Sequence, residues 1–221
     1  MKQCVSIRLF LLVIILLGAF NIKAQDPTRF NEKINELANA EYNFSSDKRL
    51  VVFAGSSSIL MWKDVQSYFP EYNVINNGFG GSHFSDLLYF YDRVILAQKP
   101  DILFIYEGDN DIANHKKPSE IFKQAKDLLK GIQQELPKTK VVFISTKPSF
   151  ARSELKNEYC KFNKKLRNFC DKKENVEFAD VWSIMHDEEG KLYSHIFTSD
   201  GLHMNKEGYD LWAKVLSGFL E

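Results

Sequence analysis

The feature that most constrains the fold of this chain is an alternation, from residue 50 onward, of short apolar runs with longer amphipathic stretches. The apolar runs are rich in β-branched residues and predict strands at residues 50–54, 72–76, 101–106, 140–145 and 176–181. Helical periodicity predicts helices at residues 28–42, 85–97, 118–135, 153–171 and 206–219. Strands and helices that alternate in this way are typical of parallel βαβ units, so we expect an α/β fold.

The N-terminal segment has a different character. Lys2 and Arg8 precede an unbroken apolar run of 12 residues, and Ala24 supplies a small residue for cleavage. This is the pattern of a secretory signal peptide. The run is shorter than the roughly 20 residues that a membrane-spanning helix needs, so we expect no stable membrane anchor. The expected organisation is a signal peptide at residues 1–24 and one domain at residues 25–221, periplasmic or extracellular after export.

The charge balance gives no sign of a nucleic-acid partner. Without the signal peptide the chain carries 26 basic and 29 acidic side chains, a net charge of about −3. Its local basic run shares a predicted helix with an apolar stripe, so we interpret it as a solvated face. Its members are Lys161, Lys164, Lys165, Arg167, Lys172 and Lys173.

Cys160 and Cys170 fall in the same predicted helix. Ten helical residues separate them by roughly 15 Å, well beyond the about 7 Å that a disulfide allows between Cα atoms. We therefore expect two buried free thiols.

Polar segments follow three of the predicted strands. In open parallel sheets, ligands bind beyond the carboxyl ends of the strands, which makes these segments candidates for a site. They read Gly55-Ser56-Ser57-Ser58, Asn76-Asn77-Gly78-Phe79-Gly80-Gly81-Ser82 and Glu107-Gly108-Asp109-Asn110-Asp111. A fourth segment, residues 199–205, precedes the last predicted helix.

Each segment taken alone has a simpler interpretation. The serines after the first strand are typical of a helix cap. The glycines at 78, 80 and 81 lack the G-x-G-x-x-G spacing of a dinucleotide loop. The third segment could bind a metal or form a turn with side-chain hydrogen bonds. Its candidate ligands are Glu107, Asp109, Asp111 and His115.

Asp200 and His203 are more informative. A separation of three residues in a turn can bring a carboxylate to the Nδ1 of an imidazole, which leaves Nε2 as a proton acceptor. A serine after the first strand can supply the hydroxyl that this pair lacks, if the fold brings the two segments to one edge of the sheet.

The four segments together resemble the SGNH hydrolases, also called the GDSL esterase/lipase family. The family pattern has G-D-S after the first strand, N-x-G-x-x-G after the second, G-x-N-D after the third and D-x-x-H near the end. This chain has Gly55-Ser56-Ser57 at the first position, and it matches the other three, in order, at residues 76–81, 108–111 and 200–203. Trp62 and Lys147-Pro148-Ser149 with Arg152 further resemble a bacterial exported branch. The resemblance implies a three-layer α/β/α sandwich, flavodoxin-like, with a five-stranded parallel sheet in the order 2-1-3-4-5 and no metal or organic cofactor.

The resemblance also implies roles for individual residues. Ser57 is expected to be the nucleophile, His203 its general base and Asp200 the carboxylate that orients the histidine. The oxyanion hole is expected from the backbone amides of Ser57 and Gly81 and the side-chain amide of Asn110, donors already in place where charge develops.

Ser56 stands where the family has aspartate, which puts the packing of this loop in question but not the triad. The candidates for contact with the substrate are Trp62, Ser82, His83 and Arg152.

The expected reaction is hydrolysis of an ester through an acyl-serine. We expect a short acyl group, acetyl above all, on a small molecule or glycan. Lysophospholipase or thioesterase activity of the same family is one alternative. A glycan-binding module without turnover and a metal phosphoesterase that uses the acidic segment are two others.

Overall fold

The computed structural model describes residues 26–221, and the signal peptide predicted at residues 1–24 lies outside them. Its five strands form one parallel sheet in the order β2-β1-β3-β4-β5, which confirms the predicted fold class and strand order. The strands are β1 (Leu50–Gly55), β2 (Asn73–Gly78), β3 (Ile102–Tyr106), β4 (Lys140–Ile144) and β5 (Val176–Ala179).

The helices occupy the connections between the strands and both ends of the described chain. The α-helices are α1 (Asn31–Ala38), α2 (Ser57–Leu60), α3 (Val65–Tyr68), α4 (Phe84–Val94), α5 (Asp109–Ala113), α6 (Pro118–Glu135), α7 (Lys156–Cys170) and α8 (Lys206–Leu216). Short 3₁₀ turns are η1 (Pro27–Phe30), η2 (Leu96–Gln98), η3 (Ser153–Leu155), η4 (Ser183–Met185) and η5 (Ser217–Phe219). The short helices α2, α3 and α5 were not predicted, because four or five residues carry too little periodicity.

Several boundaries differ from those predicted. The strand expected at residues 72–76 continues to Gly78, because Asn77 and Gly78 still pair with β1. The strand expected to reach residue 181 ends at Ala179, because the Val181 amide turns to the hydroxyl of Ser145. The helix expected at residues 28–42 ends at Ala38.

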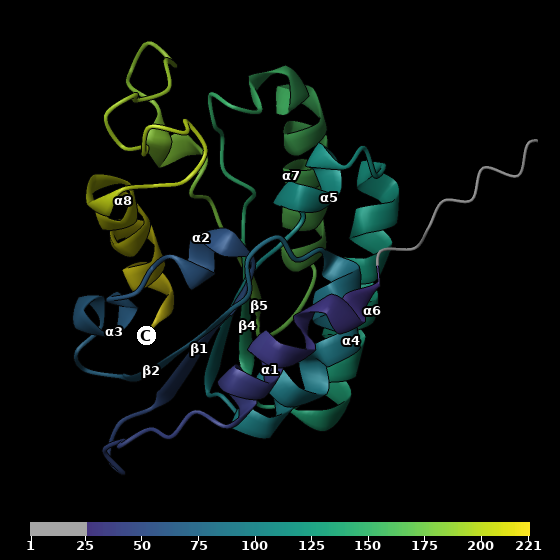
Figure 1. The fold of residues 1–221 in the computed structure, drawn as a ribbon, viewed down its shortest axis with the longest axis vertical. Coiled ribbons are helices and arrows are strands. Elements are labelled where there is room, and N and C mark those ends of the chain that lie inside the picture. Colours follow the sequence, from purple (N-terminus) through teal and green to yellow (C-terminus); the bar gives the residue numbers. More distant parts are fainter. Residues whose placement is uncertain (1–25) are drawn as a thin grey trace, which may run out of the picture.

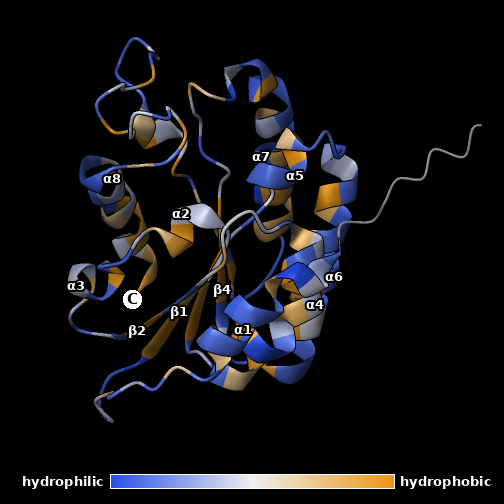
Figure 2. Ribbon diagram, viewed as in Figure 1, coloured by the Kyte–Doolittle hydropathy of each residue, from blue (hydrophilic) through white to orange (hydrophobic). Residues whose placement is uncertain are grey.

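The sheet lies between two helical layers, as a three-layer sandwich requires. Helices α1, α4, α6 and α7 cover one face, and α3 and α8 cover the other (Figure 1). Alternate residues of each strand face opposite layers: Val52 and Ala54 of β1 lie in the first core, Val51 and Phe53 in the second. Figure 2 shows the consequence, with hydrophobic strands inside and mostly hydrophilic outer helix surfaces.

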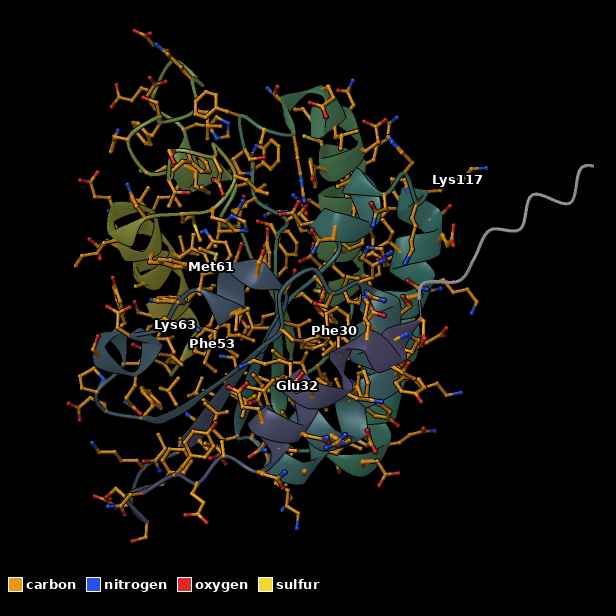
Figure 3. The ribbon with its side chains drawn as sticks, in the orientation of Figure 1. Phe30, Glu32, Phe53, Met61, Lys63 and Lys117 are labelled. Carbon is orange, nitrogen blue, oxygen red and sulfur yellow. The ribbon has the colours of Figure 1, made fainter. Side chains whose placement is uncertain are left out.

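The second core continues into the segment after β1. Phe53, labelled in Figure 3, is fully buried, whereas Met61 and Lys63 beyond α2 are exposed. The chain thus reaches the surface within a few residues of the strand end, and the serines lie at this transition.

The basic run at residues 161–173 is exposed, as expected, but one of the two thiols is not where it was predicted. Cys170 is buried, whereas Cys160 is exposed, so the prediction of two buried thiols is wrong for Cys160. The buried stripe runs through Tyr159, Phe162 and Leu166 to Cys170, and Cys160 lies one position off it. None of the helices described over residues 26–221 is long and apolar enough to cross a membrane.

Candidate active site

The four polar segments meet at the carboxyl edge of the sheet. Ser57 begins α2 directly after β1, Gly81 lies in the loop after β2, and Asn110 lies in α5 after β3. The segment before α8 brings Asp200 and His203 to the same edge.

Ser57, His203 and Asp200 form a continuous chain of hydrogen-bonding groups. The Nε2 of His203 lies 3.1 Å from the Ser57 hydroxyl, and its Nδ1 lies 2.6 Å from the Asp200 carboxylate. A carboxylate at Nδ1 fixes the tautomer in which Nε2 can accept the serine proton. The arrangement can therefore activate Ser57 for nucleophilic attack.

The turn that carries Asp200 is built around its carboxylate. Oδ1 accepts bonds from the backbone amides of Leu202 and His203 and from the hydroxyl of Thr198. Burial opposes ionisation, but these bonds and the His203 ring hold the pKa of Asp200 below its ordinary value. Asp200 thus remains a carboxylate well into the acid range. Gly201 supplies the left-handed φ of 64° that the turn requires.

The predicted oxyanion donors lie around Ser57. Gly81 has a φ of 82°, a left-handed backbone conformation that favours glycine. A Cβ atom added there would meet no atom within 4 Å, so steric crowding is not the reason for glycine at this position. The Asn110 amide donates to the Ser56 hydroxyl at 2.6 Å and to the Ser82 carbonyl at 3.0 Å. Both amide hydrogens are therefore already bonded. A bound oxyanion has to share one of these hydrogen bonds or replace its present acceptor.

The two serines that flank Ser57 have distinct positions. Ser56 is buried, and its hydroxyl accepts the Asn110 bond, so the residue that replaces the family aspartate contacts an oxyanion donor. Ser58 is also buried, and its carbonyl accepts a bond from the Tyr209 hydroxyl of α8. The position of Ser57 alone lets its hydroxyl meet His203.

Asp109, next to Asn110, is the centre of a buried ionic network. Its carboxylate accepts bonds from the hydroxyls of Tyr106 at 2.8 Å and Tyr159 at 2.6 Å, and from Arg152. Burial opposes its ionisation, but Lys147 and Arg152 keep the pKa of Asp109 below its ordinary value. Sequence reasoning missed this role, because neither tyrosine is distinguishable from a core residue by its spacing.

Lys147 connects this network to the turn of the candidate base. It is almost completely buried, and its Nζ donates to the Leu202 carbonyl at 2.6 Å while lying 3.9 Å from the Asp109 carboxylate. The loop after β3 and the turn of Asp200 are thus tied together by one cation.

Trp62, a candidate for contact with the substrate, is fully buried. Its ring stacks on Tyr209 with centroids 5.1 Å apart and meets Phe53 and Trp212 edge-on. The structure therefore corrects this expectation: Trp62 anchors α8 to the segment after β1.

Ser82 and His83 are likewise engaged with other protein groups. Both are buried, and the Ser82 hydroxyl donates to Glu107 at 2.5 Å while His83 bonds to Asn114 at 2.8 Å. Their expected contact with the substrate is corrected likewise, although the Ser82 carbonyl holds Asn110. Arg152, the fourth candidate, is partly exposed and donates to Asn110.

The acidic residues after β3 turn to separate partners. Burial raises the pKa of Glu107 well above its ordinary value, whereas Asp111 pairs with Lys116 at 2.8 Å. No group of three or more histidines, cysteines and carboxylates in residues 26–221 is placed to hold a metal ion.

Comparison with known proteins identifies the family of this chain. A model of the GDSL-like lipase/acylhydrolase family matches residues 52–211 of the chain. A search of curated proteins found no significant match.

Solved structures of similar fold come from several bacteria. A Streptococcus pneumoniae protein provisionally assigned as a platelet activating factor has a TM-score of 0.74 at 22% identity, over 88% of this chain and 92% of that one. A GDSL-like lipase from Bacteroides thetaiotaomicron has a TM-score of 0.68 at 19% identity, over 88% of this chain and 96% of that one. An acetylxylan esterase from Geobacillus stearothermophilus was solved as catalytic mutants of a serine, an aspartate and a histidine. The serine mutant has a TM-score of 0.63 at 15% identity, over 79% of this chain and 94% of that one. At these identities the likeness establishes a shared fold.

Proposed function

Because the chain belongs to the GDSL-like lipase/acylhydrolase family, we propose that it is a serine esterase with Ser57 as nucleophile, His203 as general base and Asp200 as the orienting carboxylate. The observation that carries the proposal is the continuous contact from Asp200 through His203 to Ser57, at 2.6 and 3.1 Å. These distances are within the reach of a nucleophile and its base.

The reaction has two acyl-transfer steps. Ser57 Oγ attacks the acyl carbon while its proton passes to His203 Nε2, and collapse of the tetrahedral intermediate breaks the bond to the alcohol, which leaves with that proton. Water then attacks the acyl-serine and gives a proton to Nε2. The second collapse returns this proton to Ser57 and releases the carboxylic acid.

Charge on the carbonyl oxygen develops in both steps. The proposed donors are the backbone amides of Ser57 and Gly81 and the Asn110 side chain, which lies between Ser56 and Ser82. A donor held in place before reaction stabilises the transition state, because it does not have to reorganise. Catalytic hydrogen bonds often become well aligned only when substrate is bound. The bonds of the Asn110 amide to Ser56 and Ser82 in the free protein are therefore compatible with a role as oxyanion donor.

The preferred substrate is a short-chain ester, acetyl above all, on a carbohydrate. The fold shared with an acetylxylan esterase supports this choice of substrate. The catalytic mutants of that protein replace a serine, an aspartate and a histidine, the residue types proposed here as the triad. We further propose export, on the basis of the signal-peptide pattern of residues 1–24.

Replacement of single serines tests the nucleophile. Ser57→Ala is expected to lower the turnover of p-nitrophenyl acetate by roughly 10⁶-fold, as in comparable triads. Ser58→Ala is the matched control, because it removes the hydroxyl of the adjacent residue without touching the contact to His203. Ser56→Ala also leaves that contact in place but removes the acceptor of an Asn110 bond, so a smaller loss than in Ser57→Ala is expected. A serine-directed fluorophosphonate should label Ser57, located by peptide mass spectrometry.

Three results would contradict the proposal. Full activity of Ser57→Ala would exclude this nucleophile. A folded protein that binds glycans but takes no label would favour a binding module. Loss of activity with a chelator would favour the metal phosphoesterase. A panel of acetylated sugars, lysophospholipids and thioesters, assayed with wild type and Ser57→Ala, identifies the ester class.

A further inference from the structure

A cavity of about 180 Å³ lies between the loop after β4, the start of α7 and the segment from Trp182 to Leu192. Its volume is below the roughly 300–1,000 Å³ of pockets for drug-sized ligands, so it suits one small ring. Neither Ser57 nor His203 lines it. It is therefore a compartment beside the catalytic groups.

Two contacts join this cavity to the proposed active site. Arg152 lines the cavity and donates to the Asn110 side chain at 3.0 Å. Phe150 lines it too, and its amide bonds to the Gly201 carbonyl in the turn between Asp200 and His203. A substrate whose carbonyl lies at Ser57 can therefore place a neighbouring group in the cavity.

The cavity offers aromatic surface for a ring. Phe150, Tyr159 and Trp182 all line it, and Phe150 is 47% exposed. The Tyr159 hydroxyl is already bonded to Asp109, so this residue presents ring atoms rather than a free hydroxyl. Flat apolar surfaces of this kind bury a ring while polar groups at the edges fix its orientation.

The charged groups of the lining have one sign. Lys156 and Arg152 line the cavity, and none of its lining residues is acidic. Arg152 is paired with Asp109. Lys156 is exposed, and no ion pair within residues 26–221 involves it, so its charge is available to a ligand.

We propose that this cavity binds the ring of an acidic sugar, a uronic acid, with its carboxylate beside Lys156 and its acetyl ester at Ser57. The proposal rests on the proposed esterase function and narrows its substrate class. A neutral sugar can make the same aromatic contacts but cannot form an ion pair with Lys156.

Binding is tested in the Ser57→Ala variant, which cannot turn over the ester. The probes are an O-acetylated methyl glucuronoside and the matching methyl glucoside, which differ only in a carboxylate against a hydroxymethyl group. Trp62 and Trp212 are fully buried, whereas Trp182 lines the cavity, so a change in tryptophan fluorescence reports on this compartment. The uronoside is expected to bind several-fold more tightly and to quench Trp182.

Lys156→Gln and Lys165→Gln form a matched pair on α7. Each removes one exposed positive charge, but Lys165 does not line the cavity. Lys156→Gln is expected to lower the preference for the uronoside by roughly two- to fivefold, the scale of a solvent-exposed ion pair. Lys165→Gln should leave the preference unchanged. Equal binding of both sugars, or an equal effect of both substitutions, overturns the proposal.

Turnover separates this proposal from the esterase assignment. If wild type cleaves aryl acetate through Ser57 but shows no preference for the uronoside, the uronic-acid site is wrong and the esterase stands. If the uronoside binds preferentially but Ser57→Ala has full activity, the cavity assignment stands and the nucleophile is wrong.

Discussion

The Nη2 of Arg152 donates to the Oδ1 of Asn110 across 3.0 Å, and the Nη1 of the same guanidinium bonds to the Asp109 carboxylate. The planar fork of arginine can reach two adjacent acceptors at once, which the single ammonium of lysine cannot do in the same geometry. Arg152 therefore fixes which way the Asn110 amide faces, and the Nδ2 side is directed to Ser56 and Ser82.

Arg152→Lys is expected to lower kcat by roughly tenfold, the scale of one hydrogen bond to a charged group. Asn110→Ala is expected to lower kcat by about 10²- to 10³-fold, because it removes one oxyanion donor. If Arg152 acts through Asn110, adding Arg152→Lys to Asn110→Ala should lower kcat little further. Arg167→Lys, an exposed arginine paired with Asp180, is the control and should leave kcat unchanged. Fully additive losses would show that Arg152 acts by another route.

Trp62 is expected to determine stability rather than affinity for the substrate. Trp62→Ala should lower the free energy of unfolding by about 3–5 kcal/mol, because it opens a cavity between Phe53, Tyr209 and Trp212. Trp62→Phe should cost less, since the indole nitrogen has no partner to lose. Chemical denaturation gives both values. An increased KM for aryl acetate in Trp62→Phe, at unchanged stability, would restore the role in substrate contact.

Glu107 is expected to make stability depend on pH. Burial and the neighbouring Asp111 raise the pKa of Glu107 well above its ordinary value of 4.5. Above pH 4.5 the unfolded chain therefore releases the Glu107 proton, whereas the folded protein keeps it. The contribution of Glu107 to stability should therefore fall as the pH rises beyond that value. Glu107→Gln should raise Tm at pH 8 and raise it less toward pH 5, measured by calorimetry. Glu174→Gln, an exposed control, should do neither. A Tm difference that does not change with pH would mean that Glu107 is ionised in the fold.

The two thiols of α7 are expected to react very differently. Cys160 is exposed and should be modified in the native protein. Burial raises the pKa of Cys170 to about 12, so it should react only after denaturation. Peptide mass spectrometry after native and denaturing alkylation distinguishes them. Modification of both thiols at the same rate in the native state would contradict the placement of Cys170 in the core.

Sequence patterns predicted the architecture because the architecture depends on local regularities. Apolar runs rich in β-branched residues predicted the five strands, a period of 3.6 predicted the long helices, and α6 spans the predicted residues 118–135. Boundaries were less predictable where a tertiary contact decided them, as when the Ser145 hydroxyl takes the Val181 amide at the end of β5.

Ser57, Gly81 and Asn110 were predictable because each follows a strand whose carboxyl end lies at one edge of the sheet, and Asp200 and His203 because of their spacing before the last helix. The surroundings were not, as Trp62, Ser82 and His83 show. All three are close in sequence to the loops of the site, yet their side chains are buried against α8, Glu107 and Asn114. Proximity along the chain does not tell which way a side chain points.

The sequence by itself determined the order of the elements, the segments that carry reactive groups, and the pairing of Asp200 with His203, since three residues of a turn suffice for that contact. Only the tertiary structure decided that Ser57 meets His203, from which it is separated by 146 residues. It also decided that Lys147 and Arg152 converge on the buried carboxylate of Asp109. Contacts between distant segments depend on how the layers pack, and packing is a property of the whole chain rather than of any motif.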